Sequence, residues 1–154
     1  KIIYADLTLQ QIKHKRFVNY IEPAIQEVDI AKADIVVAVG RGIGDKKNIS
    51  ITAELAEALG GVLACSRPIV DKGWLPKDYQ VGISGKTVKP KLYIALGISG
   101  SFQHVAGMRE ASTIIAINKD PKAPIFNLAD YSITDDLFNI VPTLKEKIIE
   151  LKGG

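Results

Sequence analysis

The chain has 154 residues, of which 47% are hydrophobic and 24% are charged, a balance that predicts one compact domain without a long disordered region. Its formal net charge is only +3, and basic residues are interspersed with acidic ones along most of the chain, so nucleic-acid binding is not expected. No apolar run approaches the roughly 20 residues that cross a bilayer, so we expect a soluble protein that is not membrane-embedded, cytoplasmic or, in a eukaryote, in the mitochondrial matrix.

The first part of the chain has a mixed character. Residues 1–32 show no clean periodicity, although the stretch IIYADLTL could form an edge strand. We therefore expect residues 1–32 to be a lead-in segment and residues 33–154 to form the domain.

Four apolar runs, punctuated by glycine or asparagine and rich in Val, Ile, Leu and Ala, follow in the domain. They are DIVVAVG (34–40), GVLACS (61–66), KLYIALG (91–97) and STIIAIN (112–118). Such runs, with little alternation of polar residues, are typical of strands buried on both faces of a parallel sheet. Between the first two runs, Ile51, Leu55 and Leu59 recur every four residues and share one face of a helix that Gly60 ends. The strand–helix–strand order predicts an α/β fold, a three-layer, doubly wound, mostly parallel sheet of the Rossmann-like kind.

Two later segments complete the expected outline. Residues 67–91 are rich in Pro and Gly and are expected to form a long irregular loop with at most one short strand, and loops of that length tend to be functional. Near the end, Asp135 and Asp136 could open a helix, and Pro142 suits the first turn of a final helix that ends near Leu151.

Two glycine-rich turns resemble phosphate-binding loops. Gly40-Arg41-Gly42-Ile43-Gly44 lies between a buried strand and a helix, but its spacing is not that of the dinucleotide fingerprint, so a ligand contact and a simple tight turn both stay open. The stretch 82–87, GISGKT, ends like a P-loop, yet Gln80 stands where the first glycine is required and the proline at position 90 prevents the following helix. An NTPase is therefore not expected, although this turn could present a hydroxyl and free N–H groups to a ligand.

A third turn, Gly97-Ile98-Ser99-Gly100-Ser101-Phe102-Gln103-His104, leaves a buried strand and enters a short helix. Ligands of open α/β sheets bind at the carboxyl ends of the strands, where this turn is expected to lie. His104 in the first helical turn is accordingly a candidate binding residue, with a buried structural histidine as the alternative.

The remaining residues form no catalytic constellation. The chain has only two histidines, His14 and His104, and one cysteine, Cys65, so neither a metal site nor a disulfide is expected. The aspartates that could pair for acid–base work lie in turns and at helix starts, where Asp has structural uses: Asp120, Asp130, Asp135 and Asp136. Cys65 on a buried strand is expected to be a core residue.

The run LYIALGISGSFQHVAGM, followed by TIIAINKDPKAPIFNLADYSITDDL, resembles the characteristic region of the electron transfer flavoprotein alpha subunit. The resemblance extends back through VGISGKTV and SRPIVDKGW to VGRGIG and covers about residues 33–145. It implies an FAD-binding domain. Many members of the family carry Gln-Thr where this chain has Ile83-Ser84, and serine keeps the hydroxyl group.

The resemblance assigns a set of residues to the cofactor: Arg41, Ser66, Arg67, Val81, Gly82, Ile83, Ser84, Ser99, Gly100, Ser101, Phe102, Gln103, His104, Asn118, Asp136 and Leu137. It implies that Arg67 lies close to the isoalloxazine and that the Ser84 hydroxyl bonds its reactive edge. Gln103 and His104 would lie on the N1/O2 side of the ring. The turn from Ser99 would cradle the flavin and pyrophosphate, and Asn118, Asp136 and Leu137 would bind the ADP end.

The resemblance also implies a function without bond chemistry on a substrate, that of an electron carrier rather than an enzyme. The implied partners are the electron transfer flavoprotein beta subunit, flavin dehydrogenases such as acyl-CoA dehydrogenases as donors, and a quinone reductase or another flavoprotein as acceptor. Two alternatives stay open: a fragment of a nucleotide-dependent oxidoreductase, and an adenine-nucleotide-binding module that has lost the flavin.

Overall fold

A computed structural model describes residues 29–153. The edge strand expected in IIYADLTL lies outside the described residues, so the division into a lead-in segment and a domain stays a prediction. The described part begins with a short 3-10 helix, Ile30–Lys32, whose N-terminus is capped by the Asp29 carboxylate.

The centre of the fold is a five-stranded sheet in the order β2-β1-β3-β4-β5, and every neighbouring pair is parallel. The strands are β1 (Ile35–Val39), β2 (Val62–Cys65), β3 (Leu92–Leu96), β4 (Thr113–Asn118) and β5 (Tyr131–Thr134). The first four confirm the strands expected from the apolar runs. The fifth was not expected, because its four residues lie at the sheet edge, are mostly exposed and form no apolar run.

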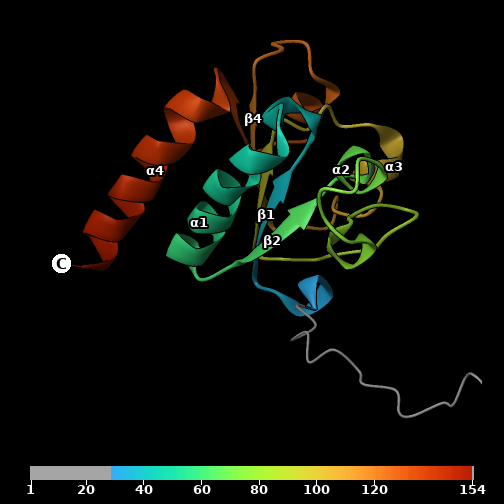
Figure 1. The fold of residues 1–154 in the computed structure, drawn as a ribbon, viewed down its shortest axis with the longest axis horizontal. Helices are drawn as coiled ribbons and strands as arrows, with labels where there is room; N and C mark the ends of the chain where they lie inside the picture. The colour runs from blue at the N-terminus through green and yellow to red at the C-terminus, as the bar shows by residue number, and fades with distance from the viewer. Residues whose placement is uncertain (1–28, 154) are drawn as a thin grey trace, which may run out of the picture.

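The two faces of the sheet carry separate hydrophobic cores, because alternate residues of a strand point to opposite sides. Val37 and Val39 of β1 pack beneath α1 (Ile49–Leu59) and α4 (Leu137–Lys152), which lie next to each other on one side of the sheet (Figure 1). Val36 and Ala38 face the other core, which is covered by α3 (Phe102–Val105) and irregular segments. The predicted three-layer α/β fold is confirmed.

Helix α1 ends as its sequence predicts. Gly60 adopts a left-handed conformation with a φ of 73°, and its N–H bonds the carbonyl groups of Ala56 and Glu57. An L-residue would be strained there, whereas glycine is not.

The segment 67–91 is more ordered than the expected irregular loop. It contains a five-residue helix, α2 (Arg67–Asp71), a 3-10 turn (Lys77–Tyr79), and isolated β-bridges from Cys65 to Gln80 and from Val81 to Lys86. A helix of five residues is too short to show a periodic apolar pattern, which is why the sequence did not predict α2. Its start does carry a recognisable feature, a proline in the first turn.

The final helix also differs from expectation at one position. Asp136 caps α4 by accepting a hydrogen bond from the Phe138 N–H, but Pro142 lies inside the helix rather than in its first turn. Proline has no N–H to donate to the preceding turn, so α4 lacks one of its backbone hydrogen bonds at Pro142, which is itself exposed. No helix within residues 29–153 is long and apolar enough to cross a bilayer.

Thr52 provides a stability test within α1. Its hydroxyl group is fully buried and lacks a hydrogen-bond partner among the described residues. Valine has the same shape without the polar atom, so Thr52→Val should raise the free energy of unfolding by about 1 kcal/mol. Thr52→Ser keeps the hydroxyl and removes a methyl group, so it should lower stability by about 1 kcal/mol. Chemical denaturation measures the change in the free energy of unfolding for each variant. If both variants are stabilised or both are destabilised, the explanation is wrong.

Candidate functional site

The site begins where the carboxyl ends of β1 and β3 meet. The Gly42 N–H donates a hydrogen bond to the Gly97 carbonyl at 3.0 Å, which holds the two following turns against each other. A Cβ atom on Gly42 would lie 2.7 Å from the Gly97 Cα, and Gly97 has a φ of 61°. The close backbone contact therefore requires glycine on both turns.

Two adjoining hollows open around these turns. The first has a volume of about 240 Å³ and is lined by Ser66, Arg67, Pro68, Asp71, Gln80, Val81, Gly82, Ser84, Ser101, Gln103 and His104. The second has a volume of about 400 Å³ and is lined by Arg41, Gly42, Ser66, Pro68, Gly97, Ile98, Ser99, Ser101, His104, Asn118, Asp120 and Ala123. Ser66, Pro68, Ser101 and His104 belong to both linings, so the hollows are two ends of one groove.

Most of the residues expected at the site lie along this groove. Those that line the first hollow are Ser66, Arg67, Val81, Gly82, Ser84, Ser101, Gln103 and His104, and the second adds Arg41, Ser99 and Asn118. Leu137 and Asn118 line a smaller hollow of about 50 Å³ beside the second.

Four expected residues line none of these hollows. Ile83 and Phe102 are exposed, at 61% and 73% of their surface. The Ile83 N–H bonds the carbonyl of Gln103, the residue after Phe102, at 2.9 Å. Gly100 packs against the backbone of Ile125, and Asp136 is engaged at the start of α4.

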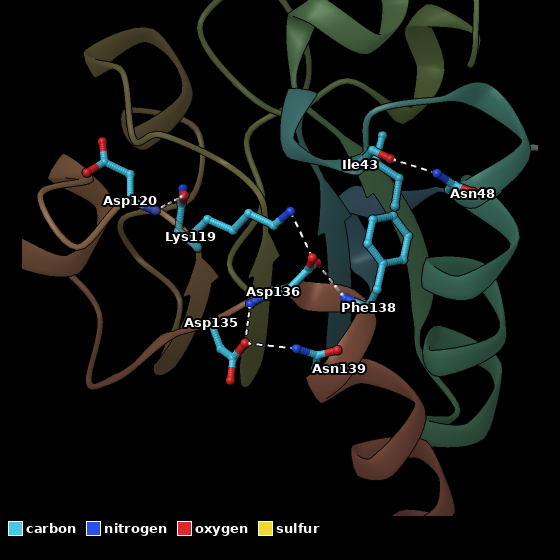
Figure 2. A network of polar contacts seen from close by, with 9 residues as sticks. Ile43, Asn48, Lys119, Asp120, Asp135, Asp136, Phe138 and Asn139 are labelled. Carbon is cyan, nitrogen blue, oxygen red and sulfur yellow. Dashed lines mark hydrogen bonds and ion pairs between the residues drawn. The ribbon is translucent and has the colours of Figure 1, made fainter.

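Asp136 belongs to a polar network at the end of the sheet (Figure 2). Its carboxylate accepts a hydrogen bond from the Phe138 N–H at 3.0 Å and pairs with the Lys119 ammonium at 2.8 Å. Both contacts hold the pKa of Asp136 below its ordinary value, the Lys119 bond contributing most. The side chain thus orients α4 next to the smaller hollow.

Asn118 ties the end of β4 to the neighbouring turn. Its amide group donates to the Ile98 carbonyl at 2.9 Å, and its side-chain carbonyl accepts from the Asp120 N–H at 3.0 Å. Both ends of the side chain already have partners, so in this structure Asn118 shapes the groove wall.

Sequence reasoning missed Gln80, a buried residue of the first hollow. Its side-chain amide donates to the Ser84 hydroxyl oxygen at 2.8 Å, and its backbone carbonyl accepts from the Lys86 N–H. The sequence did contain a signal for Gln80: it is a polar residue between Tyr79 and Val81, just before a glycine turn. We compared this position only with the first glycine of a P-loop and did not consider it as a site residue.

His104 lies where the two hollows join and is only 4% exposed. Its Nε2 atom lies 3.0 Å from the Tyr93 hydroxyl, and its Nδ1 atom has no hydrogen bond within the described residues. Burial lowers the pKa of His104 to about 4, and a weak contact with the Val81 backbone, which falls short of a well-aligned hydrogen bond, only partly opposes this shift. The imidazole is therefore neutral at pH 7, and burial likewise keeps the Tyr93 hydroxyl protonated by raising its pKa.

Positive charge lies at the rims of the groove. Arg41 and Arg67 are both exposed, and the Arg67 guanidinium pairs with Asp71 at 3.5 Å on the surface of α2. An exposed pair of this kind is weak and leaves the guanidinium free to turn toward a bound anion.

The groove offers few groups for bond chemistry. Burial raises the pKa of Cys65 to about 12, so its thiol is not a nucleophile. Within residues 29–153 no group of three or more His, Cys, Asp or Glu side chains could hold a metal ion. Hydroxyl groups, backbone N–H groups and two arginines suit an elongated, polar, anionic ligand.

Comparison with known proteins agrees with this description. Residues 29–109 match a family model described as the electron transfer flavoprotein FAD-binding domain. The chain is 51% identical over 148 residues to an electron transfer flavoprotein subunit alpha from Thermoanaerobacterium thermosaccharolyticum, a match covering 96% of this chain and 44% of that protein. It is 49% identical over 154 residues to an acryloyl-CoA reductase electron transfer subunit beta from Anaerotignum propionicum, covering 98% and 42%. It is 57% identical over 117 residues to Protein FixB from Clostridium saccharobutylicum, covering 76% and 35%. The chain thus spans less than half the length of these relatives.

Proposed function

This chain belongs to the electron transfer flavoprotein FAD-binding domain family, and from that premise we propose that it holds FAD and carries electrons between protein partners. The observation that carries the proposal is the groove at the carboxyl ends of β1, β2, β3 and β4. Its lining contains most of the residues that the family resemblance assigns to the cofactor.

The groups present in the groove fit this cofactor. FAD combines a pyrophosphate, which carries negative charge, with a flat ring whose edge has hydrogen-bond donors and acceptors. Arg41 and Arg67 supply positive charge at the rim, and Ser84 and Ser101 supply hydroxyl groups. The Nδ1 atom of His104, buried and without a hydrogen bond among the described residues, lacks the partner that such a ring edge would provide.

The turn around Gly82 supports the same fit. Gly82 has a φ of 136°, and a Cβ atom there would lie 2.7 Å from the Gln103 carbonyl oxygen. Glycine therefore lets the turn 82–85 pack closely against the start of α3, which brings Ser84 and His104 to one hollow.

We assign the ring end of the cofactor to the first hollow and the ADP end to the second and smaller ones. Arg67, Ser84 and His104 would orient the isoalloxazine, with Gln103 beside them. Asn118, Asp136 and Leu137 would border the adenosine half. When bound, the flavin supplies the redox chemistry, and this chain's residues bind it, orient it and stabilise negative charge on its ring.

The proposal includes the class of partners. We propose a carrier rather than an enzyme, and relatives named as electron transfer flavoprotein and electron transfer subunits support this. We propose the electron transfer flavoprotein beta subunit as partner, with acyl-CoA dehydrogenases or related flavin dehydrogenases as donors and a quinone reductase or other flavoprotein as acceptor. The relative named as an electron transfer subunit of acryloyl-CoA reductase supports a partner that acts on CoA thioesters.

The first experiment is a visible absorption spectrum of the purified protein after FAD is added and excess is removed. Retained flavin bands that bleach on stepwise dithionite reduction and return on reoxidation are expected. If no flavin is retained even with a beta subunit present, the carrier proposal fails and the flavin-free nucleotide-binding module becomes the better explanation.

Arg67→Ala tests the charge assigned to the first hollow. Because reduction places negative charge on the flavin ring, loss of the guanidinium should make the midpoint potential more negative by roughly 20–40 mV, about 1–2 kcal/mol for a two-electron couple. Arg109→Ala removes the same charge from an exposed position that lines neither hollow and should leave the potential unchanged. Equal shifts for both variants would mean that Arg67 acts only through net charge.

A further inference from the structure

Tyr93 lies beneath the site on β3 and is fully buried. Its hydroxyl group is 3.0 Å from the Nε2 atom of His104, and the two rings meet edge to face with their centroids 6.2 Å apart. Within residues 29–153 the hydroxyl group of Tyr93 has this nitrogen as its hydrogen-bond partner.

The direction of this hydrogen bond follows from the number of available protons. A tyrosine hydroxyl carries one proton, and a buried O–H without an acceptor costs about 1–3 kcal/mol. The nearby acceptor is Nε2 of a neutral imidazole, which accepts only when the ring proton is on the other nitrogen. Donation from the Tyr93 hydroxyl to Nε2 is favoured, because the unpaired proton is then on Nδ1 of a residue that lines the groove rather than on the fully enclosed Tyr93 oxygen.

The second ring nitrogen is thereby defined as a donor. Nδ1 is buried and makes no well-aligned hydrogen bond within the described residues, where the Val81 backbone is at most a weak acceptor for the ring, and His104 contributes to the walls of both hollows. A buried N–H without a partner beside a cavity is satisfied when a ligand acceptor atom enters that cavity.

We infer that Tyr93 is a positioning residue that holds His104 in the Nδ1-protonated tautomer, so that Nδ1–H donates to an acceptor atom of the molecule bound in the groove. The ligand half of this inference rests on the proposed function, with the flavin ring edge as acceptor. The tautomer half does not depend on any ligand.

The tautomer can be read directly by nitrogen NMR of protein carrying 15N-labelled histidine at pH 7.5, without FAD. Because the chain contains only His14 and His104, His14→Gln identifies the His104 signals. The expected spectrum shows a protonated Nδ1 and an unprotonated Nε2. A proton on Nε2 in the unmodified protein would overturn the inference, whatever the variants do.

Tyr93→Phe removes only the hydroxyl group and should shift His104 toward the Nε2-protonated tautomer, which is the more stable form of free imidazole side chains. Tyr131→Phe makes the same chemical change at an exposed residue of β5 and should leave the His104 signals unchanged. An unaltered tautomer in Tyr93→Phe would show that the hydroxyl does not set it. If this variant does not fold, the spectrum of the unmodified protein still decides which tautomer is present, and a proton on Nε2 there would overturn the inference.

The ligand half is tested by FAD titration of the same proteins. In Tyr93→Phe the His104 proton moves away from Nδ1, so the hydrogen bond from Nδ1 to the ligand is lost and FAD binding should weaken about threefold to tenfold. The affinity of Tyr131→Phe for FAD should be unchanged. Equal affinities and midpoint potentials in all three proteins would overturn the ligand half while the proposed function stands. Failure of the unmodified protein to bind FAD even with a beta subunit present would remove the proposed function and the ligand half together, but not the tautomer.

Discussion

Replacing Gly97 with alanine is expected to lower the free energy of unfolding by about 4 kcal/mol, because backbone strain and steric overlap act together at this position. Gly97 has a φ of 61°, where a side chain adds about 1–2 kcal/mol of backbone strain. The added Cβ would also lie 2.7 Å from the Gly42 Cα, and relieving such overpacking typically costs about 1–3 kcal/mol. A loss of this size is a large fraction of the stability of a small domain.

Gly73→Ala is the matched control for Gly97→Ala. Gly73 has a similar φ of 67°, but nothing lies within 4 Å of an added Cβ. It should therefore lose only the strain, about 1–2 kcal/mol. Chemical denaturation of both variants separates strain from collision, and equal losses would mean that the turns after β1 and β3 separate at little cost.

The same substitution should affect the groove. Gly97 lines the second hollow, so moving its turn away from Gly42 changes the walls of that hollow. Gly97→Ala should therefore retain less FAD than Gly73→Ala under conditions in which both are folded.

The second large effect concerns pH. In the unfolded chain the pKa of His104 has its ordinary value of 6.5, whereas burial lowers its pKa to about 4 in the folded protein. Between these values the unfolded state binds more protons, so stability is fully present above pH 6.5 and is lost as the pH falls toward 4. The loss from about pH 6.5 to about pH 4.5 should be roughly 2–3 kcal/mol.

His104→Gln is expected to flatten this pH dependence. Glutamine does not titrate, so the free energy of unfolding of the variant should change much less between about pH 6.5 and about pH 4.5. Three carboxylates with lowered pKa values in the fold lose their contribution as the pH falls through their ordinary values, which are 3.8 for Asp29 and Asp136 and 4.5 for Glu110, at or below the lower end of this range. If the free energies of unfolding of the two proteins fall in parallel across this range, His104 does not have a lowered pKa in the folded protein.

The sheet could be predicted from sequence because its central strands are buried on both faces. The runs at 34–40, 91–97 and 112–118 have no polar alternation, which leaves few alternatives to a parallel strand. β5 could not be predicted because it has only four residues and is mostly exposed, so it has no apolar run. It forms by pairing with the edge of β4. Pro142 was placed wrongly because local preference favours the first turn of a helix, whereas packing of Leu137 and Val141 against α1 carries α4 through the proline.

The position of the site could be predicted, but not its inner hydrogen bonds. Glycine turns that follow buried strands meet at one edge of a parallel sheet, and the structure brings Ser66, Ser101 and His104 together there. The contact between Tyr93 and His104 is not visible in sequence, because Tyr93 occupies an ordinary strand position and its significance depends on a distance between two elements. The exposure of Ile83 and Phe102 also follows from how two turns pack, not from their residue types.

The strand order has a consequence for the folding pathway. β1 pairs with β2 and also with β3, so the central pair closes only after the chain has passed through α1, β2 and the whole segment 66–91. Closing a long intervening segment is entropically costly and slows folding. An intermediate made of β1, α1 and β2 could form early from local contacts, but it would lack the turn after β3 and His104. The capacity to bind a ligand should therefore appear late in refolding, after the part of the helical signal that belongs to α1 has recovered.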